Sequence, residues 1–320
     1  MAVEGGRGDA AIRPSRARLR PPWTVFDPVA PLISPHWATA AGTIALDRPL
    51  VMGILNVTPD SFSDGGRFFS VDGAVARAEA MLGEGADIID VGGESTRPQD
   101  ATPVDVAEEC RRVVPVIGEI RRRFPEVVVS VDTVKADVAE RALGEGAAIV
   151  NDVSALRLDP RMGAVCARSR AGVVLMHSRG GVSDMATFAH AVYGDDVVGE
   201  VLGELMKQAE VAGASGVARE AMVLDPGIGF SKRSEHSLAV LAGLRRIVDA
   251  GLPVLVGVSR KRFIGELTGV REPAERVHGT TGANVMALVA GARIFRVHDV
   301  GAARQALDVA WAIFQREMQT

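Results

Sequence analysis

The chain has 320 residues, 47% of them hydrophobic and 24% charged, with a net charge of −4 and a pI of about 5.9. This length suits one large globular domain plus a shorter segment. The acidic balance argues against nucleic acid as the main partner, because proteins that bind nucleic acids usually present a basic face. No run of about 18 uninterrupted apolar residues occurs, so no membrane span is expected.

The N-terminal segment differs from the rest of the chain because arginine and proline dominate it and the apolar core of a signal peptide is missing. We expect residues 1–42 to form an extension that is poorly ordered or docked on the domain. Trp23, Phe26 and Trp37 are the side chains that could dock it. The domain itself is then expected to occupy residues 43–320.

Eight short apolar runs follow, each ending near a polar residue. They cover residues 51–55, 87–91, 127–131, 147–150, 173–176, 222–224, 254–258 and 294–295. Continuous apolar runs of this kind are typical of strands that are buried on both faces. Stretches of helical composition separate them, at residues 71–84, 103–123, 134–145, 159–169, 194–212, 234–249, 272–290 and 299–317.

This alternation predicts an α/β fold, a (β/α)8 TIM barrel, in which chemistry occurs at the C-terminal ends of the strands. A short hairpin over residues 43–49 is expected to close the barrel floor. Both cysteines, Cys110 and Cys166, lie in predicted helices at no metal-like spacing. We therefore expect buried reduced thiols and a cytoplasmic location.

Four cationic or potentially cationic residues follow predicted strands and should converge on one mouth of the barrel. They are Arg97, Lys261, Arg296 and His298. Such convergence predicts an anionic ligand, since arginine binds phosphate bidentately and lysine acts as a point charge. The alternative is that these side chains form salt bridges with Asp225, Asp299 or Glu94.

Neutral and acidic residues end several other strands. Asn56 follows the first and could be a weak ligand of a Mg²⁺ that a substrate phosphate mostly neutralises, or could merely cap a loop. Asp132, Asn151 and Asp225 could bind the donor-and-acceptor edge of a planar heterocycle, with Met176 packed on its ring. The alternative is that the polar groups cap loops or support other residues and that the methionine is core.

Other motifs are less informative. No His-Glu-x-x-His pair occurs, which makes a zinc site improbable. His177, which follows the fifth strand, could either anchor a loop or belong to the site. No complete dinucleotide-binding or Walker glycine motif is present.

Two long motifs resemble the signatures of the dihydropteroate synthase family. They are MGILNVTPDSFSDGG at residues 52–66 and DVGGESTRP at residues 90–98. Shorter motifs similar to those of the family follow in order: SVDT at 130–133, NDVS at 151–154, LMH at 175–177, LDPGIGF at 224–230, GVSRK at 257–261 and RVHD at 296–299. The resemblance covers residues 43–315.

The resemblance implies that 6-hydroxymethyl-7,8-dihydropterin diphosphate reacts with 4-aminobenzoate to give 7,8-dihydropteroate and diphosphate, a step of folate synthesis that sulfonamides inhibit. It implies a Mg²⁺ cofactor, bound with diphosphate through Asn56, and a homodimer formed through the last helices. A dissociative path is expected, since the pterin ring can delocalise the positive charge left when diphosphate departs.

The resemblance also assigns site residues by substrate. The pterin would be bound by Asp132, Asn151, Met176, Asp225, Gly257 and Lys261. The diphosphate would be bound by Arg97, Arg296 and His298, with Ser259 as a further substrate-binding residue. The 4-aminobenzoate would lie near Thr96, Arg97, Pro98 and Lys261, under a loop that carries Asp60, Phe62 and Ser63. The residues expected to contribute to catalysis are Asp60, Arg97, Asp132 and Lys261.

Three positions depart from the usual family pattern: Ser178, Ser231 and Arg262. Ser231 replaces a common glycine and would be strained if that position needs a positive φ. Arg262 puts the contacts to the 4-aminobenzoate carboxylate in doubt.

Two alternative functions are a pterin-binding methyltransferase and a non-catalytic homologue. The long motif over residues 56–66 and the Ser259-Arg260-Lys261 motif argue against the first. The second is disfavoured by the retained residues Asn56, Thr96, Arg97, Lys261, Arg296 and His298.

Overall fold

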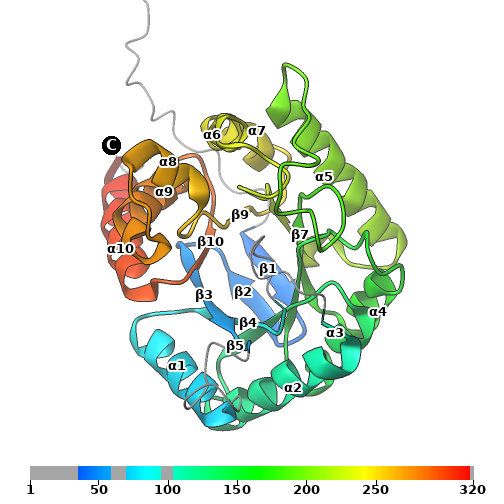
Figure 1. Cartoon of the computed structure of the whole chain (residues 1–320). Coiled ribbons are helices and arrows are strands. Elements are labelled where there is room, and N and C mark those ends of the chain that lie inside the picture. The colour runs from blue at the N-terminus through cyan, green and yellow to red at the C-terminus, as the bar shows by residue number, and fades with distance from the viewer. Residues whose placement is uncertain (1–34, 59–69, 95–103, 318–320) are drawn as a thin grey trace, which may run out of the picture.

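The structure, a computed structural model, describes residues 35–58, 70–94 and 104–317. Within this part of the chain, parallel strands form an eight-stranded sheet surrounded by helices (Figure 1). The strands are β3 (Leu50–Asn56), β4 (Ile88–Gly92), β5 (Val128–Asp132), β6 (Ile149–Asp152), β7 (Gly172–Met176), β8 (Met222–Asp225), β9 (Leu255–Val256) and β10 (Ile294–Val297). A parallel bridge between Leu224 and Val254 joins β8 to the β9 side and closes the barrel. The (β/α)8 prediction is confirmed.

The helices lie where the sequence predicts them, with two differences. They are α1 (Val71–Gly83), α2 (Val106–Arg123), α3 (Ala136–Gly144), α4 (Met162–Ser169), α5 (Val197–Ala214), α6 (Ser234–Ala242), α7 (Leu244–Val248), α8 (Arg262–Thr268), α9 (Val277–Val289) and α10 (Val300–Glu317). The helix expected over residues 234–249 is divided at Gly243 into α6 and α7. The short α8, directly after Lys261, is additional to the expected set.

Local sequence explains where several helices begin. Ser70 accepts a hydrogen bond from the Gly73 N–H at the start of α1, over 3.2 Å. Asp105 does the same for the Glu108 N–H at the start of α2, over 2.7 Å. These caps satisfy N–H groups that have no partner inside the helix, so each one fixes the exit of the preceding loop.

The hairpin on the barrel floor starts earlier in the chain than the sequence predicts. Strand β1 (His36–Thr39) pairs antiparallel with β2 (Gly42–Ala45), so the expectation of a hairpin over residues 43–49 is wrong. Trp37 is fully buried and donates its indole N–H to the Ala221 carbonyl over 2.9 Å. Burying this large ring fixes the hairpin against the barrel, which explains why pairing begins at residue 36.

Two apolar layers hold the barrel together. The larger one lies between the strands and the helices, where valine, isoleucine and alanine side chains pack. The smaller one fills the end of the barrel beside the β1–β2 hairpin and includes Trp37, Met52 and Ile294. Because all eight strands run parallel, their C-terminal ends, where the apolar runs give way to polar residues, lie at the opposite end from this floor.

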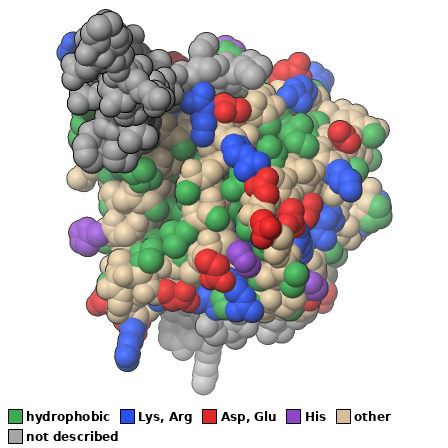
Figure 2. Space-filling model, turned by 90° about the horizontal axis from the view of Figure 1, so that it is seen from above, with side chains coloured by type: hydrophobic (Ala, Val, Ile, Leu, Met, Phe, Trp, Pro, Cys, Tyr) green, Lys and Arg blue, Asp and Glu red, His purple; other side chains and the backbone are tan. Residues whose placement is uncertain are grey.

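The outer surface carries charges of both signs. Figure 2 shows basic and acidic side chains beside one another over much of one face. Ion pairs on the molecular surface include those of Arg161 with Asp137 and of Arg246 with Asp196. No helix in the described ranges is long and apolar enough to cross a membrane.

Candidate active site

A cavity of about 770 Å³ opens at the C-terminal ends of the strands. This volume falls in the range of sites for small molecules, roughly 300–1,000 Å³. Every predicted site residue that the structure describes lines it. They are Asn56, Asp132, Asn151, Met176, Asp225, Gly257, Ser259, Lys261, Arg296 and His298. The convergence expected from the strand ends is therefore present.

The remaining predicted residues lie outside the part of the chain that the structure describes. They are Asp60, Phe62, Ser63, Thr96, Arg97 and Pro98. The chain on both sides of residues 95–103 is well anchored, because the Glu94 carboxylate accepts a hydrogen bond from the Val104 N–H over 2.9 Å. Lys135 pairs with the same carboxylate over 2.8 Å and also with Glu109.

Strand register explains why the polar groups meet. Asp132 on β5 pairs with Gly92 on one side and with Asn151 on the other. Met176 on β7 pairs with Asp225 on β8. Because side chains alternate between the two faces of a strand, these positions all face the barrel interior, whereas the next residue on β6, Asp152, bonds the backbone of its own loop.

Arg296 forms two short ion pairs in the barrel interior. Its Nε donates to Asp90 Oδ2 and its Nη2 donates to Asp132 Oδ2, both over 2.6 Å. The alternative that the cationic set forms salt bridges therefore holds for Arg296, although its partners are Asp90 and Asp132 and not the Asp225, Asp299 or Glu94 named for the set. Two carboxylates therefore face one guanidinium, which lowers the attraction of Arg296 for an anion.

Asp90 is a buried residue beneath the site that the sequence interpretation missed. It is completely buried in the middle of β4, and its Oδ2 accepts from Asn151 Nδ2 over 3.1 Å as well as from Arg296. Its Oδ1 is buried without a hydrogen-bond partner among the described residues. The signal in the sequence was a single carboxylate inside an otherwise apolar strand, a position that is costly unless it is paired.

Two carboxylates of the cavity, Asp132 and Asp225, have pKa values that burial raises well above the usual range. Burial raises the pKa of Asp132 to about 7, although the neighbouring Arg296 charge opposes the shift. Burial raises the pKa of Asp225 to about 6, opposed by a hydrogen bond from the Gly227 N–H and by the charge of Lys261. A bound group that donates N–H bonds to these oxygens would favour their ionised forms.

Lys261 and His298 lie on the side of the cavity formed by the last strands. The Lys261 ammonium lies 4.0 Å from the centre of the Phe230 ring, a cation–π contact. Ser259 Oγ accepts from the His298 backbone N–H over 3.1 Å and contacts His298 Nδ1 over 3.0 Å. Ser259 thus orients the imidazole, and Phe230 is a further cavity residue that the sequence did not single out.

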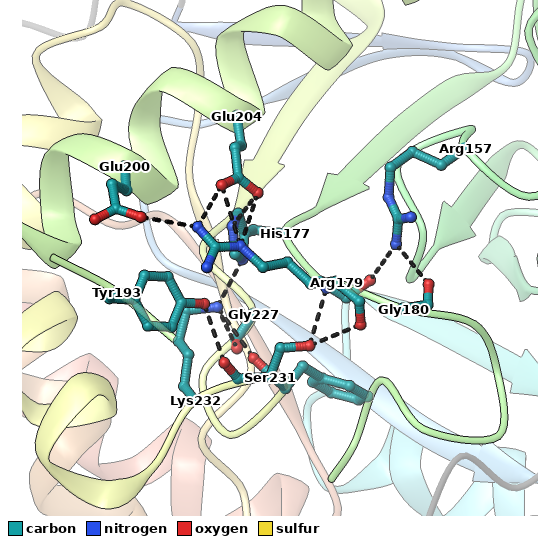
Figure 3. Close-up of polar contacts among 12 residues, drawn as sticks. Arg157, His177, Arg179, Gly180, Tyr193, Glu200, Glu204, Gly227, Ser231 and Lys232 are labelled. Carbon is teal, nitrogen blue, oxygen red and sulfur yellow. Dashed lines mark hydrogen bonds and ion pairs between the residues drawn. The ribbon is translucent and has the colours of Figure 1, made fainter. Parts of the chain in front are cut away.

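The structure resolves the ambiguity of His177. This side chain is buried, bonds Lys232 Nζ over 2.7 Å through Nδ1 and contacts Glu204 over 3.0 Å through Nε2 (Figure 3). It is not among the residues that line the cavity. His177 therefore anchors loops beneath the site, whereas its partner Lys232 reaches the cavity wall.

The three departures from the family pattern have local explanations. Ser231 has a φ of 47°, so the strain expected there is real, and its hydroxyl bonds the backbone of Arg179 and Met185. Ser178 donates to the Val153 carbonyl over 2.7 Å. Arg262 lies at the first turn of α8 with its guanidinium 3.9 Å from the centre of the Phe188 ring.

The residues present suit a metal ion that arrives with the substrate rather than a resident one. In the ranges that the structure describes, no group of three or more His, Cys, Asp or Glu could hold a metal. A Cβ built on Gly92 would lie 3.8 Å from the Asn56 Oδ1 and 3.7 Å from an Asp132 carboxylate oxygen, and Asn56 and Asp132 both line the cavity. One neutral oxygen fits Mg²⁺ if phosphate oxygens and water complete its octahedral shell.

Comparisons with known proteins agree with this geometry. A family described as pterin binding enzyme matches residues 52–298. The chain is 44% identical to a dihydropteroate synthase of Synechocystis over 84% of this chain and 91% of that protein. It is 45% identical to the Escherichia coli dihydropteroate synthase over 85% of this chain and 95% of that protein.

Solved structures give the same result. The Xanthomonas albilineans dihydropteroate synthase with 4-aminobenzoic acid has a TM-score of 0.80 and 45% identity, covering 88% of this chain and 98% of that chain. The same enzyme in complex with 7,8-dihydropteroate has a TM-score of 0.77 at 43% identity, covering 86% and 98%. On sequence, fold and cavity together, the chain belongs to the dihydropteroate synthase family of pterin-binding enzymes.

Proposed function

We propose that this chain condenses 6-hydroxymethyl-7,8-dihydropterin diphosphate with 4-aminobenzoate to give 7,8-dihydropteroate and diphosphate in folate biosynthesis. The observation that carries the proposal is one cavity lined both by carboxylate and amide groups, Asp132, Asn151 and Asp225, and by Lys261 and His298. This combination suits a substrate that carries both a hydrogen-bonding ring and a diphosphate. The relatives that hold 4-aminobenzoic acid and 7,8-dihydropteroate support the choice of substrates.

The pterin ring is assigned to the buried polar side of the cavity. Asp225 offers a carboxylate that can accept two parallel N–H bonds from a 2-amino-pyrimidinone edge. Asn151 and Asp132 lie on adjacent strands and supply further donors and acceptors. Met176 and Gly257 line the same cavity, and a Cβ on Gly257 would be in ordinary contact with Asp225 Oδ2, at 3.9 Å.

The diphosphate is assigned to the rim formed by β9 and β10. Lys261 and His298 lie there, and Arg97 is a further candidate from outside the described residues. Arg296 contributes less direct attraction than the sequence suggested, because Asp90 and Asp132 already neutralise it. Mg²⁺, held by Asn56 and the phosphate oxygens, would stabilise the negative charge of the leaving group.

The chemistry needs no nucleophilic side chain. When the C–O bond to diphosphate breaks, positive charge remains on the exocyclic carbon and spreads into the pterin ring. The Asp132 carboxylate lies in the pterin part of the cavity and can stabilise this charge. The arylamine nitrogen of 4-aminobenzoate then forms the new C–N bond, and its proton can pass to diphosphate or water.

The direct test is product formation from the two substrates by the purified protein, with and without Mg²⁺. We expect 7,8-dihydropteroate in an assay that contains both substrates and Mg²⁺, and strongly reduced product when the metal is chelated. The free pterin alcohol in place of its diphosphate is the matched control and should give no product. Absence of product under all conditions would refute the proposed function.

The binding of a pterin should depend on pH because Asp225 must be ionised to accept two N–H bonds. With a pKa of about 6 in the free protein, Asp225 is mostly protonated at pH 5. We expect the affinity for 6-hydroxymethylpterin, measured by calorimetry, to fall by about tenfold per pH unit below that value. An Asp225→Asn variant should bind weakly and without this dependence; a wild-type affinity that stays constant from pH 7 to pH 5 would contradict the assignment.

We also propose that the chain forms a homodimer through its last helices. Helices α9 and α10 pack beside each other and expose large apolar side chains: Met286 is 60% exposed, Val309 63% and Ile313 60%. Exposed apolar patches of this kind mark interaction surfaces. Light scattering after gel filtration should give a dimer mass for the wild type and a monomer mass for Ile313→Glu. A monomeric wild type would refute this proposal.

A cytoplasmic location remains part of the proposal. Cys110 and Cys166 are both buried free thiols, which suits a reducing compartment. Fractionation of cells that express the protein would test it.

A further inference from the structure

Lys232 is a lysine that the reaction scheme above does not use, although it reaches the cavity wall. It is only 1% exposed, and lysine is almost never fully buried unless it is paired. Its Nζ lies 2.7 Å from His177 Nδ1, 3.1 Å from the Gly227 carbonyl oxygen and 3.2 Å from the Phe230 carbonyl oxygen (Figure 3).

These three neighbours match the three N–H donors of an ammonium. Burial lowers the pKa of Lys232 to about 7, and the Gly227 carbonyl also accepts from the Phe230 N–H, so this arrangement is that of the charged form. His177 Nδ1 must then accept, so Nε2 carries the proton and donates to Glu204. Burial lowers the pKa of His177 to about 4, which keeps the imidazole neutral as this arrangement requires.

Two of the acceptors belong to the loop of residues 226–231, between β8 and α6. Two glycines of this loop have a positive φ, Gly227 at 64° and Gly229 at 78°, and both pack closely against neighbouring segments. A Cβ on Gly227 would lie 1.9 Å from the His177 carbonyl oxygen. A Cβ on Gly229 would lie 3.3 Å from Lys261 Cδ, so the loop packs directly against the stem of that lysine.

A second anchor ties the same loop to the segment that follows β7. Ser231 Oγ lies 2.8 Å from the Arg179 carbonyl oxygen and 3.0 Å from the Met185 carbonyl oxygen, and it accepts from the Arg179 N–H over 2.9 Å. Arg179 is fixed in turn by Glu200 and Glu204 (Figure 3). The loop is therefore held from below by Lys232 and from the side by Ser231.

We propose that Lys232 is a positioning residue for Lys261. By binding the carbonyls at both ends of the turn from Gly227 to Phe230, it holds the Phe230 ring under the Lys261 ammonium, and that ring fixes the ammonium at the cavity rim. The catalytic part of this inference rests on the proposed function, because it is there that Lys261 contacts both substrates.

The test uses the small number of lysines in the protein. The chain has four, Lys135, Lys207, Lys232 and Lys261, so a sample labelled with carbon-13 at lysine Cε gives four signals that substitutions can assign. We expect the Lys261 signal of the wild type to show a ring-current shift from Phe230. Phe230→Leu should abolish that shift, and Lys232→Met should strongly reduce it.

Kinetics provide the second readout. We expect Lys232→Met to lower kcat/KM for 4-aminobenzoate by about tenfold, the effect of weakening one partly desolvated cation–π contact. In a Phe230→Leu background the same substitution should cost much less, because the two residues act along one path. Equal losses in both backgrounds would show that Lys232 acts only on general stability and would overturn the proposal.

Controls separate the possible failures. Lys207→Met makes the same substitution at an exposed position of α5 and should change neither readout. If Lys232→Met does not fold, His177→Leu removes one of the three acceptors and should partly reduce the Lys261 shift; an unchanged shift would overturn the proposal. The spectra need no substrate, so they decide the positioning role even if the protein does not make 7,8-dihydropteroate.

Discussion

Replacing Arg296 with alanine should lower the free energy of unfolding by about 3–5 kcal/mol, the usual cost of removing one partner from a buried ion pair. The variant would leave Asp90 and Asp132 close together without the guanidinium that binds both. Asp90 is completely buried, so it cannot recover the lost interaction from water. Turnover should also be lost, because Asp132 would no longer be held in the pterin part of the cavity.

Denaturant unfolding at several pH values can test this expectation. Burial already raises the pKa of Asp132 to about 7, so its ionised form destabilises the folded state, and that penalty is relieved as the pH falls through this value. Without Arg296 this penalty grows. The difference in the free energy of unfolding between the variant and the wild type should therefore be largest at pH 8 and smaller at pH 5. The control Arg304→Ala removes an arginine at the barrel floor, and its stability difference from the wild type should not become smaller at pH 5. A stability difference for Arg296→Ala that does not change with pH would contradict the argument.

Replacing Lys261 with alanine should lower kcat/KM by roughly 10²–10³-fold, as the loss of one preorganised electrostatic contact to the reacting groups does. Lys261 lines the cavity, and the proposed function places it beside both the pterin and the diphosphate, so both the binding and the departure of diphosphate should suffer. Stability should change little, because the side chain contacts the Phe230 ring and the Gly229 backbone at the cavity rim rather than the barrel core.

Steady-state kinetics with both substrates would measure the effect of Lys261→Ala, with Lys261→Arg as the variant that retains a positive charge. We expect the arginine variant to keep part of the activity, since it preserves the charge but not its position. A rate near that of the wild type for Lys261→Ala would remove this residue from the site.

The barrel and most of its site could be predicted because the chain obeys simple periodicities. Each strand is an apolar run that ends at a polar residue, and parallel strands bring those ends together. Asp132, Asn151 and Asp225 were predicted in this way and all line the cavity. Asp90 could not be predicted from the strand ends, because it lies in the middle of β4, inside the barrel.

Other features depend on contacts between segments distant in the sequence. The partners of Arg296 lie 206 and 164 residues away, which no local pattern indicates. Lys232 looks like a surface lysine at the start of a helix and becomes buried only because the 226–231 loop folds over it towards His177. The predicted start of the hairpin, residue 43, was wrong because the strand that begins at residue 36 is fixed by Trp37, which packs into the barrel floor. Strand propensity does not indicate such a contact.

The sealed barrel floor provides an internal optical probe. Trp37 is buried there with its indole N–H bonded to Ala221, at the end of the barrel opposite the strand tips that line the cavity. Its fluorescence emission should be blue-shifted in the native protein and should respond to opening of the whole barrel. Trp311, stacked on Phe314 within α10, would instead follow changes at the outer helices.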